Sequence, residues 1–471
     1  MTKWDKKRNE LIVKAHRWRQ KHVSDAVFTF VVALLIGLCT GVGAFVLKYH
    51  IGHISTYLTQ NLALTGYNLH LLILPLAGIL ITGIYVRYIA REPLTHGTSC
   101  IMHDMSRGIS RLNGSLTYAP IIGCSITLGC GGSAGSEGPI AYAGAAMGSN
   151  IGRMFRVHPR FLMMLVGCGA GAGIAAIFKA PVGGMLFTLE VLKMELTTLS
   201  VVMLLSACLI SALTAYVLSG CTVDIDYAGA LPFDTSTLPF VLLLGVFCGV
   251  YSLYYSGVMK RMDRFFSGLR NPWIKSIIAG LSISVLVFLF PAFYGEGYGI
   301  IGKVLNGAPQ AIADYSMFYP SGADSLSLLL IVGCIALLKS FITSATNSGG
   351  GVGGDFAPTL FAGSMAGLFF VMSLNMYFGT QLDSGNFAYF AMAGVMAGAI
   401  HAPLMAIFLT VEMTGQYTLL LPLTIVASIS YGVVKLFRDK NFLIDRIEFW
   451  YHSHRRHVSL RNNGAAPVDK N

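Results

Sequence analysis

The chain has 471 residues and a formal net charge of +11, from 33 lysines and arginines against 22 aspartates and glutamates. Only 12% of its residues are charged and 54% are hydrophobic, whereas about 25% of the residues of a typical soluble domain are charged. So many apolar residues cannot all be hidden in one globular interior. The composition therefore excludes a soluble enzyme and predicts that lipid surrounds much of the surface.

The first predicted element is the basic N-terminal segment, residues 1–24. Trp4, Leu11 and Trp18 are spaced among its charges, which predicts an amphipathic helix on the cytoplasmic membrane surface; a frayed basic tail is the alternative. The next apolar run, Val27–Leu47, is long enough to span a bilayer and does not resemble a cleaved signal sequence. We expect it to remain in the mature protein.

Further charge-poor segments follow along the chain. They are Asn68–Val86, Asn113–Gly152, Phe161–Phe178, Leu196–Val223, Thr235–Met259, Ser276–Gly295 and nearly all of Ser340–Val434. Several are too long for one helix and are broken by glycine or proline, which at membrane depth is tolerated only where the freed backbone is buried in protein or lines a cavity. Such segments are typical of a transport path through a membrane protein.

The charges of the connecting segments predict the orientation of the chain. The basic segments are the N-terminus, Arg87–Arg111, Arg153–Arg160, Lys260–Lys275 and Arg446–Lys470, whereas the segments around Asp224 and Glu296 are acidic or neutral. By the positive-inside rule the basic segments and both termini are cytoplasmic. Because the basic residues are spread over loops between spans, we expect no nucleic-acid partner.

The sequence predicts no metal and no cofactor. Its nine cysteines are scattered through apolar runs, and His452, His454 and His457 lie on the tail 446–471, which is too short for a folded regulatory domain. We find no nucleophile–base pair, so we expect no enzyme. The compact chain without a signal peptide is typical of a prokaryotic inner-membrane protein.

Motifs in the first half recur in the second half at matching distances, which predicts two repeats, residues 25–223 and 235–445. The matching pairs are Gly131 with Gly350, Pro139 with Pro358, Gly148 with Gly367, Ala180 with Ala402, Pro181 with Pro403 and Glu190 with Glu412. Chance similarity of glycine-rich segments is the alternative. A duplicated membrane unit is typical of transporters that bind their ion between the two copies.

Each repeat contains a glycine-rich break before a helix. The breaks are Gly131–Pro139, followed by Ile140–Ile151, and Gly353–Pro358, followed by Thr359–Leu368. Proline near a first turn, with glycine before it, predicts a helix N-terminus whose free N–H groups and positive dipole end attract an anion. Two such N-termini can share one anion without a full-charge cation, which would bind the anion too tightly to release it.

Glu137 is the only charged residue between Asn113 and Gly152, and it lies inside the first break. A lone carboxylate at membrane depth is costly and therefore indicates function. When ionised it can occupy an anion site, and when protonated it can leave. We predict that Glu137 is a gate that couples anion occupancy to protons; the alternative is a carboxylate that only caps a helix.

Several motifs together resemble the CLC chloride channel and transporter family. They are Gly131–Pro139, Gly354–Pro358, Ala176–Pro181 with Glu190, and His401–Pro403 with Glu412–Gly415, within a likeness that runs from about Val27 to Ile444. The resemblance implies an all-α integral membrane protein, built of two inverted repeats of tilted and broken helices. It also implies a homodimer with one anion pore per subunit and a dimer surface near 186–213 and 404–430.

The resemblance also assigns roles to residues. Glu137 matches the gating glutamate, the amides of Asp355 and Phe356 match those that hold the central anion, and His96 replaces a serine that contacts it. The anion-binding residues expected are His96, Gly97, Ser136, Gly138, Asp355, Phe356, Ala357 and Ile444. We expect the Asp355 carboxylate to point into a polar pocket while its backbone N–H serves the site; an ionised carboxylate that faces the pore and opposes anion binding is the alternative.

Two positions depart from the family and bear on mechanism. Ile444 stands where an inner-gate tyrosine is expected, and Val191 stands where many exchangers have a second proton glutamate. Protons would then need a water chain or a detour through Glu190 or Glu195. Because Glu190 is matched by Glu412 in the other repeat, we expect it to bond nearby backbone instead.

The leading prediction is CLC-type anion transport, namely chloride/proton antiport gated by Glu137. A passive chloride channel is the runner-up, favoured by Val191 and by the missing tyrosine, and a fluoride transporter is third. The expected partners are chloride, protons, the lipid bilayer and a second copy of the chain.

Overall fold

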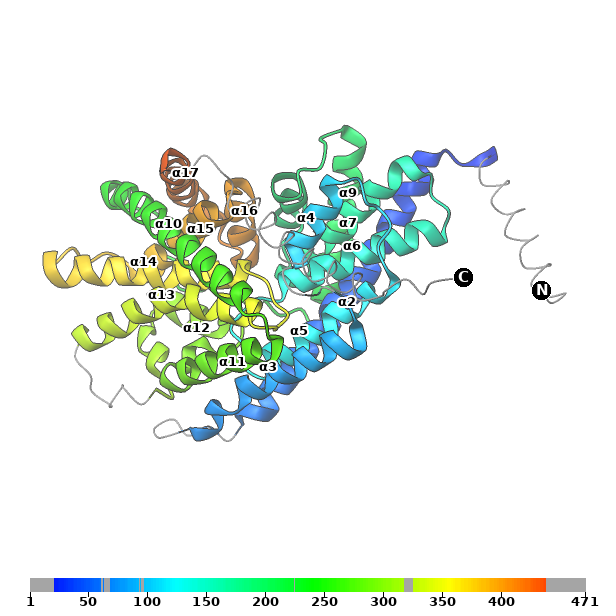
Figure 1. The fold of residues 1–471 in the computed structure, drawn as a ribbon. Coiled ribbons are helices and arrows are strands. Elements are labelled where there is room, and N and C mark those ends of the chain that lie inside the picture. The colour runs from blue at the N-terminus through cyan, green and yellow to red at the C-terminus, as the bar shows by residue number, and fades with distance from the viewer. Residues whose placement is uncertain are drawn as a thin grey trace.

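The computed structural model describes residues 21–60, 62, 68–92, 94, 97–223, 225–316 and 325–437, and the structural statements below refer to these residues. The predicted tail 446–471, His96 and Ile444 lie outside them, as does most of the predicted helix over residues 1–24. Figure 1 shows a helical protein in which helices α6, α7 and α9 of the first half and α13–α17 of the second half lie side by side.

The structure contains sixteen α-helices over the described residues. In chain order they are α2 (Asp25–Thr59), α3 (Leu74–Ile84), α4 (Gly97–Ser106), α5 (Ala119–Gly129), α6 (Glu137–Met154), α7 (Pro159–Phe178), α8 (Pro181–Leu186), α9 (Thr198–Leu218), α10 (Leu238–Gly268), α11 (Pro272–Leu289), α12 (Tyr298–Leu305), α13 (Ser325–Ser348), α14 (Phe356–Phe378), α15 (Ser384–Ile400), α16 (Pro403–Thr414) and α17 (Leu420–Phe437). Short 3-10 turns connect several of them, and two π-helical turns, η2 (Tyr85–Ala90) and η4 (Phe187–Val191), extend α3 and α8.

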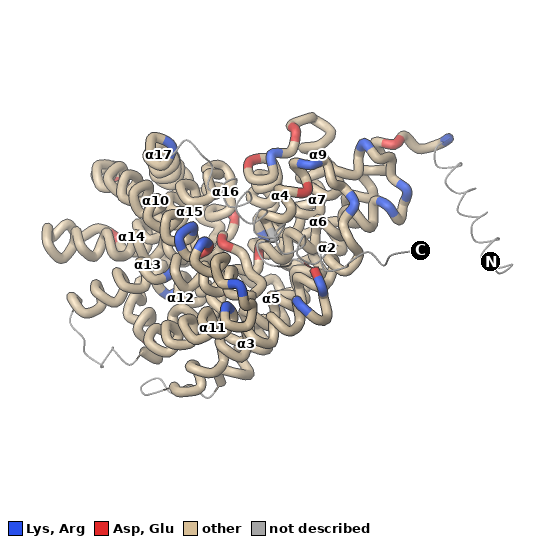
Figure 2. The backbone as a smooth tube through the Cα atoms, viewed as in Figure 1, with Lys and Arg blue, Asp and Glu red and all other residues tan. Residues whose placement is uncertain are grey.

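Within the described residues, nine helical segments are long and apolar enough to cross a membrane. Their most apolar windows have mean hydropathies between 1.6 and 2.6 and hold few charges, as the long uncharged stretches in Figure 2 illustrate. Other helices, such as α5, α8 and α16, are too short to span. The prediction of an all-α membrane protein with broken helices is confirmed.

Helices of the two halves pack in corresponding pairs. In the first half, α2 packs against α7 and α9, and α6 packs against α7. In the second half, α10 packs against α15 and α17, and α14 packs against α15. The halves are joined by contact between α8 and α16 and by an antiparallel bridge between Gly135 and Gly354.

Glycine allows the closest of these helix crossings. A Cβ atom on Gly144 of α6 would lie 2.1 Å from the carbonyl oxygen of Gly169 on α7, and a Cβ on Gly169 would lie 2.0 Å from the carbonyl oxygen of Gly144. Small residues let membrane helices approach in this way. The crossing fixes α6, and with it the position of Glu137 at the helix start.

Candidate anion-binding site

The two glycine-rich breaks meet in the interior. The Gly135 amide donates to the Gly354 carbonyl oxygen at 3.0 Å, and the Gly354 amide donates back to Gly135 at 2.6 Å. Two residues beyond this bridge, α6 and α14 begin at Glu137 and Phe356. The residue before each helix, Ser136 or Asp355, makes no side-chain cap, so the first-turn amides of both helices are available to an anion.

Both helices begin slightly earlier than predicted. Pro139 and Pro358 are each the third residue of their helix, where a missing N–H costs nothing because the first-turn amides have no partner within the helix. The sequence prediction started each helix after its proline, and this is corrected by three residues. The correction makes Glu137 and Phe356 the first residues of the two N-termini.

The Glu137 carboxylate binds a helix N-terminus in the other half of the chain. Its Oε1 accepts hydrogen bonds from the amides of Phe356 at 2.5 Å and Ala357 at 3.3 Å, and the residue is 0% exposed. A Cβ on Gly135 or Gly354 would lie 1.9 or 2.4 Å from its oxygens, so both glycines are needed to make room. The carboxylate therefore stands where the positive end of α14 would hold a free anion.

Helix α4 brings a third N-terminus towards the same place. It begins at Gly97, and the hydroxyl oxygen of Thr98 is 3.4 Å from the position of a Cβ built on Gly138. A Cβ on Gly138 would also lie 3.2 Å from the Cα of Gly354. Of the predicted residues, Phe356 and Ala357 thus bind Glu137, and Gly138 lies beside the first turn of α4, which begins at Gly97.

Ser136 is close to Glu137 but its donors point elsewhere. Its hydroxyl and its amide both donate to Glu296 Oε1, the amide at 3.1 Å. Glu296 Oε2 in turn forms an ion pair with Lys48 at 3.1 Å, and the Lys48 ammonium lies 4.4 Å from the centre of the Tyr298 ring. In this structure Ser136 therefore fixes the first break to Glu296 and gives no hydrogen bond to the Glu137 carboxylate.

The sequence analysis missed Lys339, which is 0% exposed in α13. Its Nζ donates to the Ser133 hydroxyl in the first break at 2.9 Å and lies 4.5 Å from the centre of the Phe361 ring. It interacts electrostatically with Glu137 and Glu296. The signal for it in the sequence is that Lys339 is the single charge within the apolar run Ser325–Ser348.

Asp355 has a polar partner, as expected. Its Oδ1 accepts a hydrogen bond from Asn347 Nδ2 at 2.7 Å. The next residue, Phe356, supplies the amide that binds Glu137, and its ring packs edge-on against Phe187 with 5.6 Å between centroids. The carboxylate of Asp355 thus lies beside the N-terminus of α14 without occupying it.

Glu190 and Glu412 each bind backbone amides in the opposite half of the chain. Glu190 accepts from Leu404 at 3.3 Å and Met405 at 2.7 Å, in the first turn of α16. Glu412 accepts from the corresponding residues of α8, Val182 at 3.1 Å and Gly183 at 2.8 Å. The prediction that Glu190 and Glu412 share a role in bonding backbone is confirmed.

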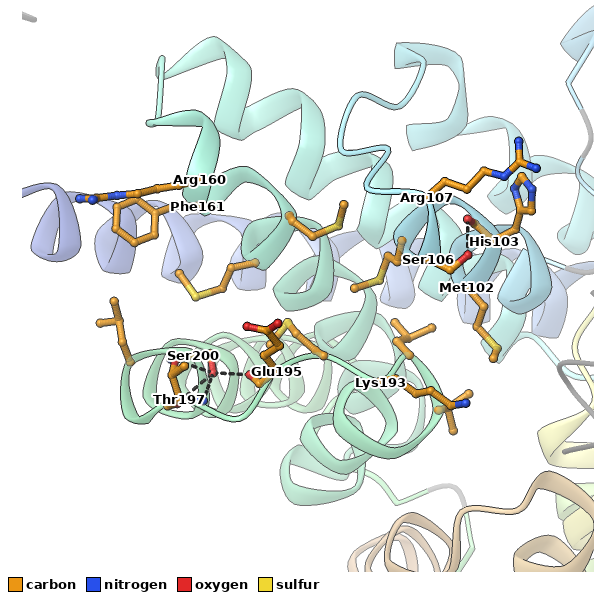
Figure 3. Close-up of a pocket in the computed structure, with 17 residues that line it drawn as sticks. Met102, His103, Ser106, Arg107, Arg160, Phe161, Lys193, Glu195, Thr197 and Ser200 are labelled. Atoms are coloured by element: carbon orange, nitrogen blue, oxygen red, sulfur yellow. Dashed lines mark hydrogen bonds between the residues drawn. The ribbon is translucent and has the colours of Figure 1, made fainter. Parts of the chain in front are cut away.

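A cavity of about 780 Å³ lies between α4, the start of α7 and the segment 191–200, and Figure 3 shows its lining. Val191 and Glu195 are part of its wall, and Arg107, Arg160 and Lys193 lie around it. Phe187, which begins the π-helical turn that ends at Val191, is buried, and its ring contacts Phe356. The cavity wall thus carries an apolar side chain, and no carboxylate, at position 191.

Helix α4 carries a partly buried carboxyl group, Asp104, beside His103. Burial raises the pKa of the Asp104 carboxyl above its usual value, and this is partly offset by a hydrogen bond from His103, whose Nδ1 lies 3.5 Å from Asp104 Oδ1.

No group of three metal-ligating side chains occurs within the described ranges between residues 21 and 437. The site around Glu137 consists of backbone amides, the buried lysine Lys339 and the carboxylates of Glu137, Glu296 and Asp355.

Comparison with known proteins agrees with these motifs. The model of the voltage gated chloride channel family matches residues 77–435. A putative chloride channel protein ClcB-like from Ralstonia nicotianae is 28% identical over 370 residues, which are 76% of this chain and 81% of that protein.

Two further comparisons involve exchangers. The H(+)/Cl(-) exchange transporter ClcA of Vibrio cholerae is 32% identical over 311 residues, 63% of this chain and 62% of that protein, so the match spans less than two thirds of its length. The crystal structure of a slow cyanobacterial Cl-/H+ antiporter superposes with a TM-score of 0.75 at 23% identity, covering 89% of this chain and 97% of the other, which establishes the fold. With more than half of its length matched by the family model, the chain belongs to the voltage-gated chloride channel family, the CLC family that its motifs resemble.

Proposed function

We propose that this protein is a chloride/proton antiporter in which Glu137 serves both ions. The observation that carries the proposal is the binding of the Glu137 carboxylate by the amides of Phe356 and Ala357. An ionised carboxylate and a chloride ion are both held by free amides at a helix N-terminus. The N-terminus of α14 therefore holds one or the other.

Protonation of Glu137 is the step that exchanges the two occupants. Hydrogen bonds from amides to an ionised carboxylate are about twice as strong as those to a neutral acceptor, and a neutral carboxyl group no longer interacts favourably with the helix dipole. A protonated Glu137 therefore leaves the amides, and chloride takes its place. When the proton is released, the carboxylate returns and expels the chloride.

Similarity to exchangers supports this proposal, although it carries no residue roles by itself. The Vibrio cholerae relative is named an exchange transporter of protons and chloride, and the cyanobacterial structure is titled a Cl-/H+ antiporter. We propose the same pair of ions for this chain. Of the other anions, fluoride is the alternative substrate.

A passive chloride channel is the second candidate. It is favoured by Val191 in the cavity wall and by Phe187 beside Phe356, because neither side chain can carry a proton. The Ralstonia relative is named a putative chloride channel. In this alternative Glu137 opens and closes the path, but protons do not cross with chloride.

We further propose a homodimer in a prokaryotic inner membrane, with both termini cytoplasmic. Leucines on α9 and α17 are exposed on the chain surface, with Leu209 54%, Leu213 54% and Leu421 62% exposed. These helices belong to the surface at which the family resemblance places the partner. Replacing Leu209 with Trp should convert a dimer into a monomer in detergent, and an unchanged particle mass would argue against this interface.

The experiment for exchange is proton uptake into liposomes that hold the purified protein and an outward chloride gradient. The antiport proposal predicts that protons move inward as chloride leaves, even though no proton gradient is imposed. It also predicts that Glu137→Gln abolishes proton movement while chloride still flows. Chloride efflux without any proton movement in the wild type would support the channel. Repeating the assay with fluoride in place of chloride tests the third alternative.

A further inference from the structure

Asp355 is the one partly exposed residue in the buried stretch 351–368. All of its neighbours in that stretch, including Gly354 and Phe356, are buried. Glu137, which is bonded to the very next amide, is 0% exposed. Part of Asp355 is therefore accessible from outside, one residue away from the amide that binds Glu137, whereas Glu137 itself is enclosed.

Asp355 lies on the cytoplasmic side of Glu137. The second break is held by Ser276, whose hydroxyl donates to the Gly349 carbonyl at 2.8 Å, and Ser276 lies at the start of α11 beside the basic segment Lys260–Lys275. The first break is held from beyond the other end of α11, where the Tyr294 hydroxyl donates to the Gly129 carbonyl at 2.7 Å. Because α11 is a spanning helix, the positive-inside rule places the second break and Asp355 towards the cytoplasm.

Glu137 and the residue that donates to Asp355 each carry one buried oxygen atom with no hydrogen-bond partner among the described residues. One is Glu137 Oε2 and the other is Oδ1 of Asn347, the residue whose Nδ2 donates to Asp355. Buried acceptors are normally satisfied by a protein group, a water molecule or a proton. Each of these oxygen atoms can accept a hydrogen bond from a water molecule or from a proton carrier.

The charged groups around Glu137 and Asp355 lie on two sides. Glu296 and Lys339 act on Glu137 from the first break, and Asp355 acts on it from the second. On the α10 side, Asp263 accepts from the hydroxyls of Ser344 and Ser348 and interacts with Lys275. Asp355 is thus the carboxylate nearest to Glu137 on the cytoplasmic side.

We propose that Asp355 is the cytoplasmic proton carrier that exchanges protons with Glu137. This inference rests on the proposed antiport function. A protonated Asp355 gives its proton to the Glu137 carboxylate, directly or through one water molecule. Asp355 becomes a carboxylate, and the neutral Glu137 leaves the amides of α14.

Cytoplasmic water then returns a proton to Asp355, and the cycle balances with one proton taken from the cytoplasm and one placed on Glu137. The same group also favours correct coupling. An ionised Asp355 beside the α14 N-terminus repels an incoming anion, whereas a protonated Asp355 does not. Protonation of Asp355 therefore favours chloride entry, and bound chloride favours the protonated form of Asp355.

The test compares chloride flux and chloride-driven proton uptake in liposomes for the wild type, Asp355→Asn and Asp104→Asn. Asp104 is the matched control, because it is a partly buried carboxyl group on the cytoplasmic side that takes no part in the proposed path. We expect Asp355→Asn to keep the chloride flux of the wild type and to take up protons at least about tenfold more slowly. A tenfold slower rate corresponds to an activation free energy higher by about 1.4 kcal/mol. Asp104→Asn should keep both.

Each outcome separates the two proposals. Wild-type proton uptake with full uptake in Asp355→Asn overturns the role of Asp355 and leaves antiport intact, whereas the absence of proton uptake in the wild type overturns antiport and this inference with it.

If Asp355→Asn does not fold, Asn347→Leu provides the test. Loss of the Asn347 donor favours the protonated form of Asp355, so the pH midpoint of proton uptake should rise by about one unit, and an unchanged midpoint overturns the inference.

Discussion

At the scale of single residues, the site depends on where one carboxylate is bound. Glu137 could be selected from the sequence because it is the only charge in a long apolar stretch, and the glycine and proline around it predict a helix start. That its carboxylate binds the amides of Phe356 and Ala357, about 220 residues away in the chain, could not be predicted, because this contact depends on how the two halves pack.

Replacing Glu137 with Gln tests its role as the gate. Glutamine imitates the protonated side chain and is not attracted to the positive end of α14, so chloride flux should persist. The pH dependence of the flux should largely disappear between pH 4 and 8, which can be measured in liposomes with a chloride electrode. A variant with the same pH dependence as the wild type would contradict the assignment.

Lys339 could have been found by a stricter reading, because it is the only charged residue in the apolar run Ser325–Ser348. Its hydrogen bond to Ser133 could not, because the two residues are 206 positions apart. Lys339→Met removes a buried positive charge near the anion site while keeping the bulk of the chain. Losing about 1 kcal/mol of attraction should weaken apparent chloride affinity on the order of fivefold, as measured by flux against chloride concentration.

The control for Lys339 is Lys303→Met. Lys303 pairs with Asp314 at 3.3 Å on the surface, where it is 55% exposed, so its loss should leave chloride affinity unchanged. Equal affinities in Lys339→Met and the wild type would mean that the buried lysine serves only to hold the first break.

At the scale of helices, the contact between α6 and α7 depends on two glycines. Gly144→Ala would place a methyl group 2.1 Å from the Gly169 carbonyl oxygen, so the helices must move apart. Overpacking of this kind costs about 1–3 kcal/mol, and the thermal midpoint of the protein in detergent should fall. Gly52→Ala on α2 is the control, because no atom lies within 4 Å of its Cβ position; an equal effect of the two changes would contradict the argument.

The crossed bonds of Glu190 and Glu412 predict equal effects for two substitutions. Each carboxylate binds two first-turn amides of the helix opposite, so Glu190→Gln and Glu412→Gln should each lower stability by about 1–3 kcal/mol. The ratio of protons to chloride should stay the same in both. A changed ratio in Glu190→Gln alone would instead make Glu190 a proton relay.

At the scale of the whole molecule, the sequence predicts a repeat because motifs of the first half recur in the second half at matching distances. The structure adds that α2 and α10 hold corresponding places in the two halves, since each packs against the equivalent pair of helices. These two helices share no motif that the sequence analysis could match. Their equivalence depends on packing between apolar faces, which many sequences satisfy.

The central claim, that chloride and protons are exchanged through a site controlled by Glu137, is tested most directly by the reversal potential of the protein in a planar bilayer. With a fixed chloride gradient, antiport predicts that the reversal potential shifts when a pH gradient is imposed, and that this shift is absent in Glu137→Gln. A reversal potential that stays at the chloride equilibrium value under every pH gradient would contradict exchange and identify the protein as a channel.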